Sequence, residues 1–145
     1  MIGLLQRVTQ ASVTVEGSVV GAIERGLLVF IGVQPQDGVK NAARLVERLL
    51  GYRVFPDATG RMNLSLHDIA GGLLLVPQFT LAADTTKGTR ASFTSAAHPT
   101  EGAKLFEECV RLARSQHPRV ATGRFGVDMQ VALINDGPVT FWLTA

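Results

Sequence analysis

Cysteine is almost absent from this sequence, since Cys109 is the only one. An internal disulfide is therefore excluded, which is typical of proteins in the reducing cytosol. No apolar run reaches the roughly 18 residues that a membrane-spanning helix needs. The apolar N-terminus is interrupted early by Arg7 and carries no basic region before it, so we expect no signal peptide. We expect a cytoplasmic protein with no membrane partner.

Histidine is also scarce, and the recognised motifs of side-chain catalysis are missing. None of His67, His98 and His117 is spaced with another His, Cys or Glu as zinc ligands are. No Walker loop, no G-x-S-x-G turn and no evident carboxylate pair occurs. We expect no metal and no cofactor. If the chain is an enzyme, its catalysis should depend on positioning and backbone hydrogen bonds.

Charge and hydropathy give weaker indications. The net charge of +2 fits a slightly basic enzyme as well as a nucleic-acid binder, and Lys87 and Arg90 form only a modest basic cluster. The hydrophobic content of 46% is high and suggests an apolar face kept for a partner subunit. The length predicts a single domain over residues 1–145.

The residue pattern predicts strands separated by two helices. Residues 1–33 show the pattern of strands, and the apolar run at 27–33 is typical of a buried central strand. Asp37 is expected to cap a helix at 39–50 that Gly51 closes. The further expected elements are strands at 53–55 and 73–79, a polar loop at 83–92, a helix between Pro99 and Pro118, and strands at 127–134 and 139–143. This order indicates an α+β fold with an antiparallel or mixed sheet, curled toward a barrel, and two main helices.

The stretch 135–140, Asn-Asp-Gly-Pro-Val-Thr, lies between the last two expected strands. A Gly-Pro peptide bond can be cis at small cost, and Gly137 has no Cβ, so its backbone can approach a ligand closely. The alternative is a plain Asp-Gly hairpin turn followed by Pro138.

Several segments together carry a family resemblance. They are Gln6-Arg7-Val8, residues 13–15, Pro-Gln-Phe-Thr-Leu at 77–81, residues 82–85 with 87–93, Thr-Gly-Arg-Phe-Gly-Val-Asp-Met at 122–129, and the 135–140 stretch. In this order they resemble D-aminoacyl-tRNA deacylases over essentially the whole chain.

The resemblance implies a homodimer with its active site at the subunit interface. It implies hydrolysis of the ester that joins a D-amino acid to the terminal adenosine of tRNA, and release of glycine mischarged on tRNA-Ala. It also implies that Gly137-Pro138 is cis and enters the pocket of the other subunit. There its carbonyl oxygens would leave room for a hydrogen on the substrate α-carbon but not for an L side chain, because a rigid backbone excludes by steric clash.

The same resemblance suggests roles at the end of the second buried strand. Thr80 would be a pocket residue rather than an ordinary strand residue, and its hydroxyl is a candidate nucleophile without a visible base. The N–H groups of Phe79 and Thr80 would instead bind the ester carbonyl oxygen, with help from the ribose 2′-hydroxyl. Gln78 would shape the pocket. Phe79 would pack against the adenosine or simply fill the core.

Further roles concern residues distant in sequence. Arg7 would orient the Gly-Pro carbonyl unless it lies on a solvated strand face. Met129, otherwise core filler, and Asn135 would line the substrate pocket. Lys87 and Arg90 would contact phosphates at the tRNA 3′ end or form a merely solvated loop.

Two positions depart from the family pattern. Pro77 replaces the usual serine, so a serine hydroxyl there cannot be required, and Ala91 replaces the usual proline. A related animal tRNA deacylase with relaxed chirality also has proline at the first position but lacks the phenylalanine found at Phe79. Two rival hypotheses remain: a non-catalytic nucleic-acid-binding module and a plain dimeric scaffold.

Overall fold

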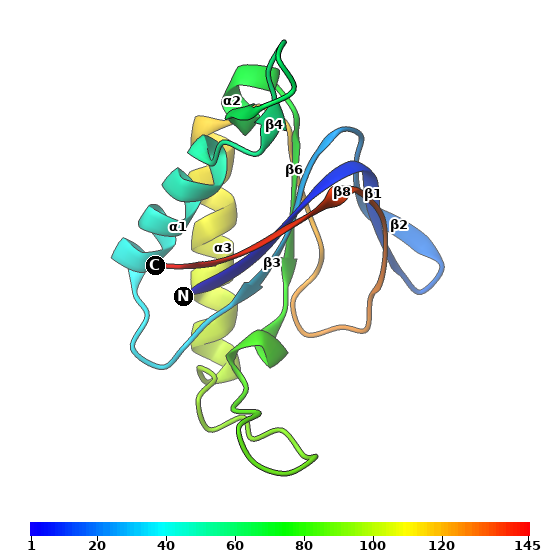
Figure 1. Cartoon of the computed structure of the whole chain (residues 1–145). Helices are drawn as coiled ribbons and strands as arrows, with labels where there is room; N and C mark the ends of the chain where they lie inside the picture. Colours follow the sequence, from blue (N-terminus) through cyan, green and yellow to red (C-terminus); the bar gives the residue numbers. More distant parts are fainter.

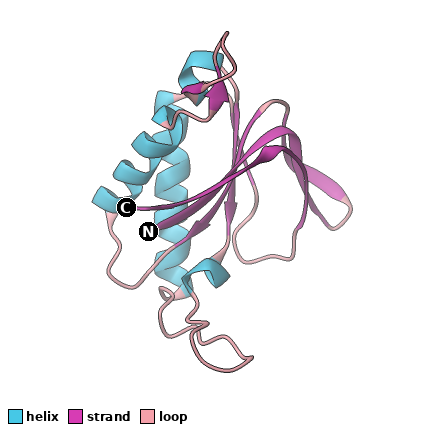
Figure 2. Ribbon diagram, in the orientation of Figure 1, coloured by secondary structure: helices cyan, strands magenta, loops and turns pink.

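The computed structural model describes residues 1–145 as a six-stranded mixed sheet with two long helices on one face (Figures 1 and 2). The strand order is β2-β1-β3-β6-β7, and β8 pairs with β1. The bounds are β1 (Ile2–Val15), β2 (Ser18–Ile23), β3 (Gly26–Gly32), β6 (Gly72–Pro77), β7 (Val120–Thr122), β8 (Gln130–Thr144), α1 (Val39–Gly51) and α3 (Pro99–Gln116). Shorter elements are β4 (Phe55–Pro56), β5 (Met62–Leu64), α2 (Leu66–Ile69) and a 3-10 helix, η1 (Phe79–Ala82). No helix is long and apolar enough to cross a membrane.

The central strands β3 and β6 are parallel and are buried on both faces. Leu27 and Leu73 pack into the core between the sheet and the helices, whereas Leu28 and Leu74 belong to a second core on the other side. Because both faces exclude water, nearly every position of a strand of this kind is apolar. The buried central strand expected at 27–33 is therefore confirmed.

Strand β1 curls the sheet toward a barrel. Its first half pairs with β3 and its second half with β2, while β8 follows its other edge. The curl brings β2 against β7, where a Cβ added to Gly21 would lie 2.5 Å from the carbonyl oxygen of Thr122. The nearly closed mixed sheet and two long helices confirm the predicted α+β class.

The ends of α1 differ from the prediction. Gly38, not Asp37, is the N-cap, and its backbone N–H donates to Asn41 Oδ1 at 2.9 Å. Asp37 instead accepts hydrogen bonds from the Met1 amine at 2.5 Å and from the Gln34 N–H at 2.7 Å. At the other end, Gly51 is the last helical residue rather than the residue that closes the helix. Capping by Asp37 was wrong, because its carboxylate is bonded to the N-terminal amine and to the backbone of the preceding loop.

Two short strands also have corrected bounds. The strand expected at 53–55 is β4 (Phe55–Pro56), since its pairing with β5 starts at Phe55. The strand expected at 73–79 ends at Pro77, where the chain turns into η1. Helix α3 begins at Pro99 as predicted, and His98 is its N-cap.

The two strands expected at 127–134 and 139–143 form one continuous strand, β8. Both halves pair antiparallel with β1, from Thr14↔Gln130 to Ile2↔Thr144. The 135–140 stretch is therefore not a hairpin turn. It is a bulge within a strand whose partner continues on both sides.

Candidate active site

The site is built around the point where β6 ends. Gln78 donates its backbone N–H to Ile31 O at 2.8 Å, which is the last bond to β3. The chain then turns, and the Leu81 N–H bonds back to Gln78 O at 3.2 Å. Gly32 permits this turn, because a Cβ there would meet Leu81 Cβ at 3.0 Å. The turn directs Phe79 outward, and 56% of its surface is exposed.

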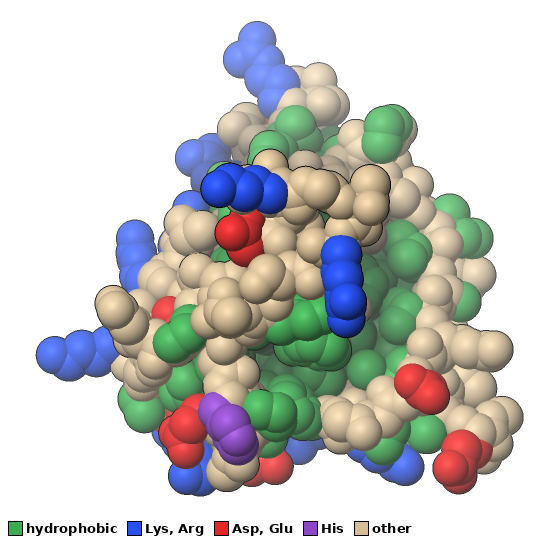
Figure 3. Space-filling model, turned by 90° about the horizontal axis from the view of Figure 1, so that it is seen from below, with side chains coloured by type: hydrophobic (Ala, Val, Ile, Leu, Met, Phe, Trp, Pro, Cys, Tyr) green, Lys and Arg blue, Asp and Glu red, His purple; other side chains and the backbone are tan.

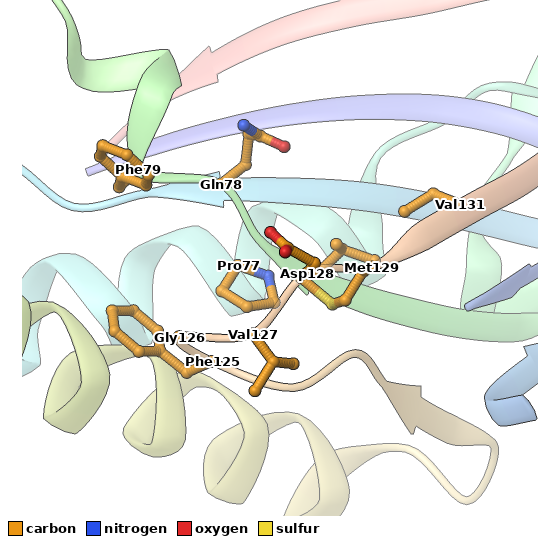
Figure 4. A pocket seen from close by; sticks show the side chains of 10 residues that line it. Pro77, Gln78, Phe79, Phe125, Gly126, Val127, Asp128, Met129 and Val131 are labelled. Carbon is orange, nitrogen blue, oxygen red and sulfur yellow. The ribbon is translucent and has the colours of Figure 1, made fainter. Parts of the chain in front are cut away.

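The turn opens onto a cavity of about 390 Å³. One wall is formed by the 77–79 segment and the other by the segment that enters β8, including Phe125, Asp128 and Met129 (Figure 4). Asp128 is the only charged residue of the lining. Seen from the end that carries η1 and the following loop, the molecule has a hollow with hydrophobic side chains on its floor and basic side chains near its rim (Figure 3).

A second, smaller cavity of about 200 Å³ adjoins the first. The two cavities share Phe79, Phe125 and Gly126. The smaller one is almost wholly apolar and reaches Phe106 and Gly102 of α3. A Cβ on Gly102 would touch the Phe125 ring at 3.4 Å, so the absence of a side chain leaves this chamber open.

Thr80 lies on η1 and is exposed. Its Oγ1 accepts a hydrogen bond from Gln78 Nε2. A carboxamide cannot take a proton, so this partner cannot activate the hydroxyl as a nucleophile. The first N–H groups of a helix have no carbonyl partner within it. Phe79 and Thr80 begin η1, and their backbone N–H groups are therefore donors suited to an oxyanion.

The Gly137-Pro138 peptide bond is cis, as the resemblance implied. Both residues are exposed, and neither lines either cavity of its own chain. Four residues, 136–139, separate Asn135, which pairs with Val8, from Thr140, which pairs with Gln6. The bulge thus projects the Gly-Pro unit from the sheet.

Arg7 contacts the backbone of the bulge through its side chain. Its side chain is only 12% exposed, so it does not lie on a solvated face. Arg7 Nε donates to the carbonyl oxygen of Asp136 at 2.8 Å, and its Nη1 donates to Val54 O at 2.6 Å. The carbonyl that it holds is the one immediately before Gly137.

The other predicted site residues fall into two groups. Met129 lines the larger cavity, and its sulfur accepts the Arg124 N–H at 3.3 Å. Asn135 does not line it, because its side chain is bonded to backbone groups of the bulge. Lys87 and Arg90 are exposed on the loop after η1.

That loop is closed at its base by two backbone hydrogen bonds between Asp84 and Ser92, at 2.8 and 2.9 Å. Hydrogen bonds from Thr86 to the Asp84 carboxylate lower the pKa of that side chain. Beyond the closure, Phe93 packs on Phe79 with ring centroids 5.2 Å apart. The loop is thereby joined to the cavity wall.

Other chemistry has little support in this geometry. Burial raises the pKa of the Cys109 thiol to about 12, which suits a core residue and not a nucleophile. Nowhere do three His, Cys, Asp or Glu side chains gather as metal ligands. Phe125 and Asp128 were not assigned site roles from the sequence, although both lie in the 122–129 segment of the resemblance.

Comparison with known proteins places this chain in a family. A family model described as D-Tyr-tRNA(Tyr) deacylase matches residues 4–144. A protein named D-aminoacyl-tRNA deacylase from Pseudomonas paraeruginosa is 62% identical over 99% of this chain and 99% of its own length. One of the same name from Thioalkalivibrio sulfidiphilus is 65% identical over 99% of this chain and 96% of its own length.

Two solved structures share the fold over almost their entire lengths. One named "c-Myc DNA Unwinding Element Binding Protein" has a TM-score of 0.95 and 35% identity, covering 100% of this chain and 99% of that chain. A probable eukaryotic D-amino acid tRNA deacylase has a TM-score of 0.86 and covers 99% and 98%. At 19% identity, the latter likeness concerns the fold alone.

Proposed function

We propose a function from the premise that this chain belongs to the D-Tyr-tRNA(Tyr) deacylase family, as its sequence predicted. The chain is a D-aminoacyl-tRNA deacylase, a hydrolase acting on the ester of aminoacyl-tRNA. Its substrate range, its chiral selection and its assembly are what we infer from the geometry.

The two adjoining cavities suit the two parts of the substrate. The flat aromatic faces of the adenine at the tRNA 3′ end suit the smaller chamber between Phe79 and Phe125, with the phosphates of the tRNA 3′ end toward the loop that carries Lys87 and Arg90. The ester and the amino acid then occupy the larger cavity. There the Asp128 carboxylate complements the α-ammonium group.

The proposed catalytic groups are the backbone N–H groups at the start of η1. They bind the carbonyl oxygen of the ester as negative charge develops on it. The oxygen of a water molecule bonds to the carbonyl carbon, the bond from that carbon to the ribose oxygen breaks, and a proton of that water passes to the ribose oxygen. The vicinal ribose hydroxyl assists this transfer, so no side-chain base is needed.

Chiral selection is assigned to Gly137 and Pro138 of a second copy of the chain. Both residues are exposed and line neither of the two cavities of their own chain, which supports their entering a cavity of a second copy. Trp142 and Ile134 on β8 are each more than half exposed, which provides apolar contact area for such a partner. A backbone wall next to the substrate α-carbon leaves room for a hydrogen atom. Glycine has only hydrogen on its α-carbon, so glycine mischarged on tRNA-Ala is also released.

The direct test is the deacylation rate on D-tyrosyl-tRNA and on L-tyrosyl-tRNA. The D ester should be hydrolysed much faster, and glycyl-tRNA-Ala should also be a substrate. Equal rates on both tyrosyl esters would contradict chiral selection. Nucleic-acid binding with no turnover would instead support the hypothesis of a non-catalytic binding module. This hypothesis is tested as well because one structural relative is named as a DNA-binding protein.

The shared site is tested by mixing two variants. Met129→Arg fills the cavity and should be inactive, whereas Gly137→Ala distorts the bulge and should lose the preference for D esters, because the added Cβ would overlap the backbone nitrogen of Val139. Co-expressed subunits should form mixed dimers in which the active site combines an intact cavity with an intact bulge, and the preference for D esters should return. If mixed dimers form and the preference stays lost, the cavity and the bulge do not work across subunits. Sedimentation of the wild type checks the dimer itself.

A further inference from the structure

The side chain of Asn135 closes the bulge that presents Gly137 and Pro138. Its Nδ2 donates to Val139 O at 3.1 Å and to Arg7 O at 3.3 Å. Its Oδ1 accepts the Val139 N–H at 2.9 Å. One carboxamide thus uses both of its N–H groups and its oxygen on main-chain atoms.

These bonds replace strand pairing that the bulge has lost. The four residues 136–139 lie opposite Arg7 alone, so β1 cannot pair with each of them. The Asn135 carboxamide supplies Val139 with both an acceptor and a donor, as a neighbouring strand would do. It also ties Val139 to the backbone of Arg7 on β1.

Arg7 and Asn135 hold opposite ends of the Gly-Pro unit. The Arg7 guanidinium fixes the carbonyl of Asp136, immediately before Gly137. The Asn135 carboxamide fixes both backbone groups of Val139, immediately after Pro138. With both flanking residues held, the carbonyl oxygens between them have little freedom to move.

We propose that Asn135 is a positioning residue for chiral selection and not a substrate-pocket residue. This inference rests on the proposed gate function of Gly137 and Pro138. Asn135 sets how closely their carbonyl oxygens approach the substrate α-carbon. A loosened wall admits an L side chain, so loss of the carboxamide raises turnover of L esters relative to D esters.

The side-chain chemistry at this position is demanding. The Asn135→Asp substitution would keep an acceptor for the Val139 N–H but place a negative oxygen against two carbonyl oxygens. Asn135→Leu has nearly the same shape and no polar atoms, whereas Asn135→Gln keeps every group on a longer stem. Asn63→Asp is the matched control, because Asn63 donates to Asp57 in a hairpin outside the site.

The experiment measures single-turnover rates on D- and L-tyrosyl-tRNA, together with the melting temperature of each variant. Asn135→Asp and Asn135→Leu should lower the D-to-L rate ratio by about fivefold or more, as expected from losing hydrogen bonds worth roughly 1 kcal/mol each. The ratio should be unchanged in Asn63→Asp. A D-to-L ratio within fivefold of wild type in both Asn135 variants, whatever their stability, overturns the proposal.

Two further readouts keep the result decisive. If both variants fail to fold, Asn135→Gln is measured well below its melting temperature, and the same fivefold threshold applies to its rate ratio. Failure of the proposed function looks different: wild-type protein would then show no preference for the D ester. A purely structural role of Asn135 would lower the melting temperature and both rates together while leaving their ratio intact.

Discussion

Removal of the Thr80 hydroxyl tests whether the backbone or a side chain carries the chemistry. In Thr80→Ala the backbone N–H groups at the start of η1 remain. The only hydrogen bond lost is the one that Gln78 Nε2 donates to the Thr80 hydroxyl. One such bond is worth about 1 kcal/mol, which corresponds to roughly a fivefold fall in kcat. Removing a true catalytic nucleophile reduces kcat by a factor on the order of a million in a serine protease. The two hypotheses therefore differ by several orders of magnitude.

The assay is single-turnover deacylation of D-tyrosyl-tRNA with enzyme in excess, so that product release does not limit the rate. Thr59→Ala is a matched control, because Thr59 also hydrogen-bonds a nearby side chain but lies in a turn away from the cavity. Circular dichroism verifies that both variants are folded. A loss of more than about a thousandfold in folded Thr80→Ala, or an acyl group trapped on Thr80, would refute backbone catalysis.

Three other perturbations test the fold and the RNA contacts. In chemical denaturation, Gly26→Ala should lower the free energy of unfolding by roughly 3 kcal/mol or more, because its Cβ would overlap a backbone oxygen of β6. In Gly51→Ala the added Cβ meets no atom within 4 Å, so the free energy of unfolding should rise. Cys109 should resist thiol reagents at pH 8 until the chain unfolds. Between pH 9.0 and about 12 the thiol ionises only in the unfolded chain, so the free energy of unfolding should fall as the pH rises through that range, and it should fall less in Cys109→Ala. Replacing Lys87 and Arg90 by Ala should raise KM and lower the slope of log KM against log salt by about one to two, and an unchanged slope would place the phosphate contacts elsewhere.

The sequence was most informative where structure depends on local pattern. The run at 27–33 was recognisable as a buried central strand because parallel strands covered on both faces are apolar at almost every position. Pro99 marked the start of α3 because proline suits the first turn of a helix. In both cases, the signal and the structure lie within a few residues of each other.

Long-range pairing explains the main errors. Asp-Gly-Pro at 136–138 is a turn signal, yet the chain continues as β8 because β1 pairs with it on both sides of the bulge. The hydrogen bonds of Asn135 were likewise not evident from the local sequence, since one of its partners, Arg7, is 128 positions away. Asp37 was also misassigned, because the Met1 amine competes for the carboxylate that would have capped α1. No local pattern contains these partners.

The cavity and the bulge are fixed by different parts of the chain, and this separation has a functional consequence. The wall of the cavity depends on the end of β6 and on the segment before β8. The bulge depends on Arg7, Asn135 and the carbonyl of Val54, all in the same chain as the bulge itself. Under the proposed assembly, the conformation of the bulge is therefore fixed within each subunit. Dimer formation then only has to position the bulge at the cavity of the partner. Substitutions around the bulge should then change the ratio of D to L turnover, whereas substitutions in the cavity should change the rates on both esters together.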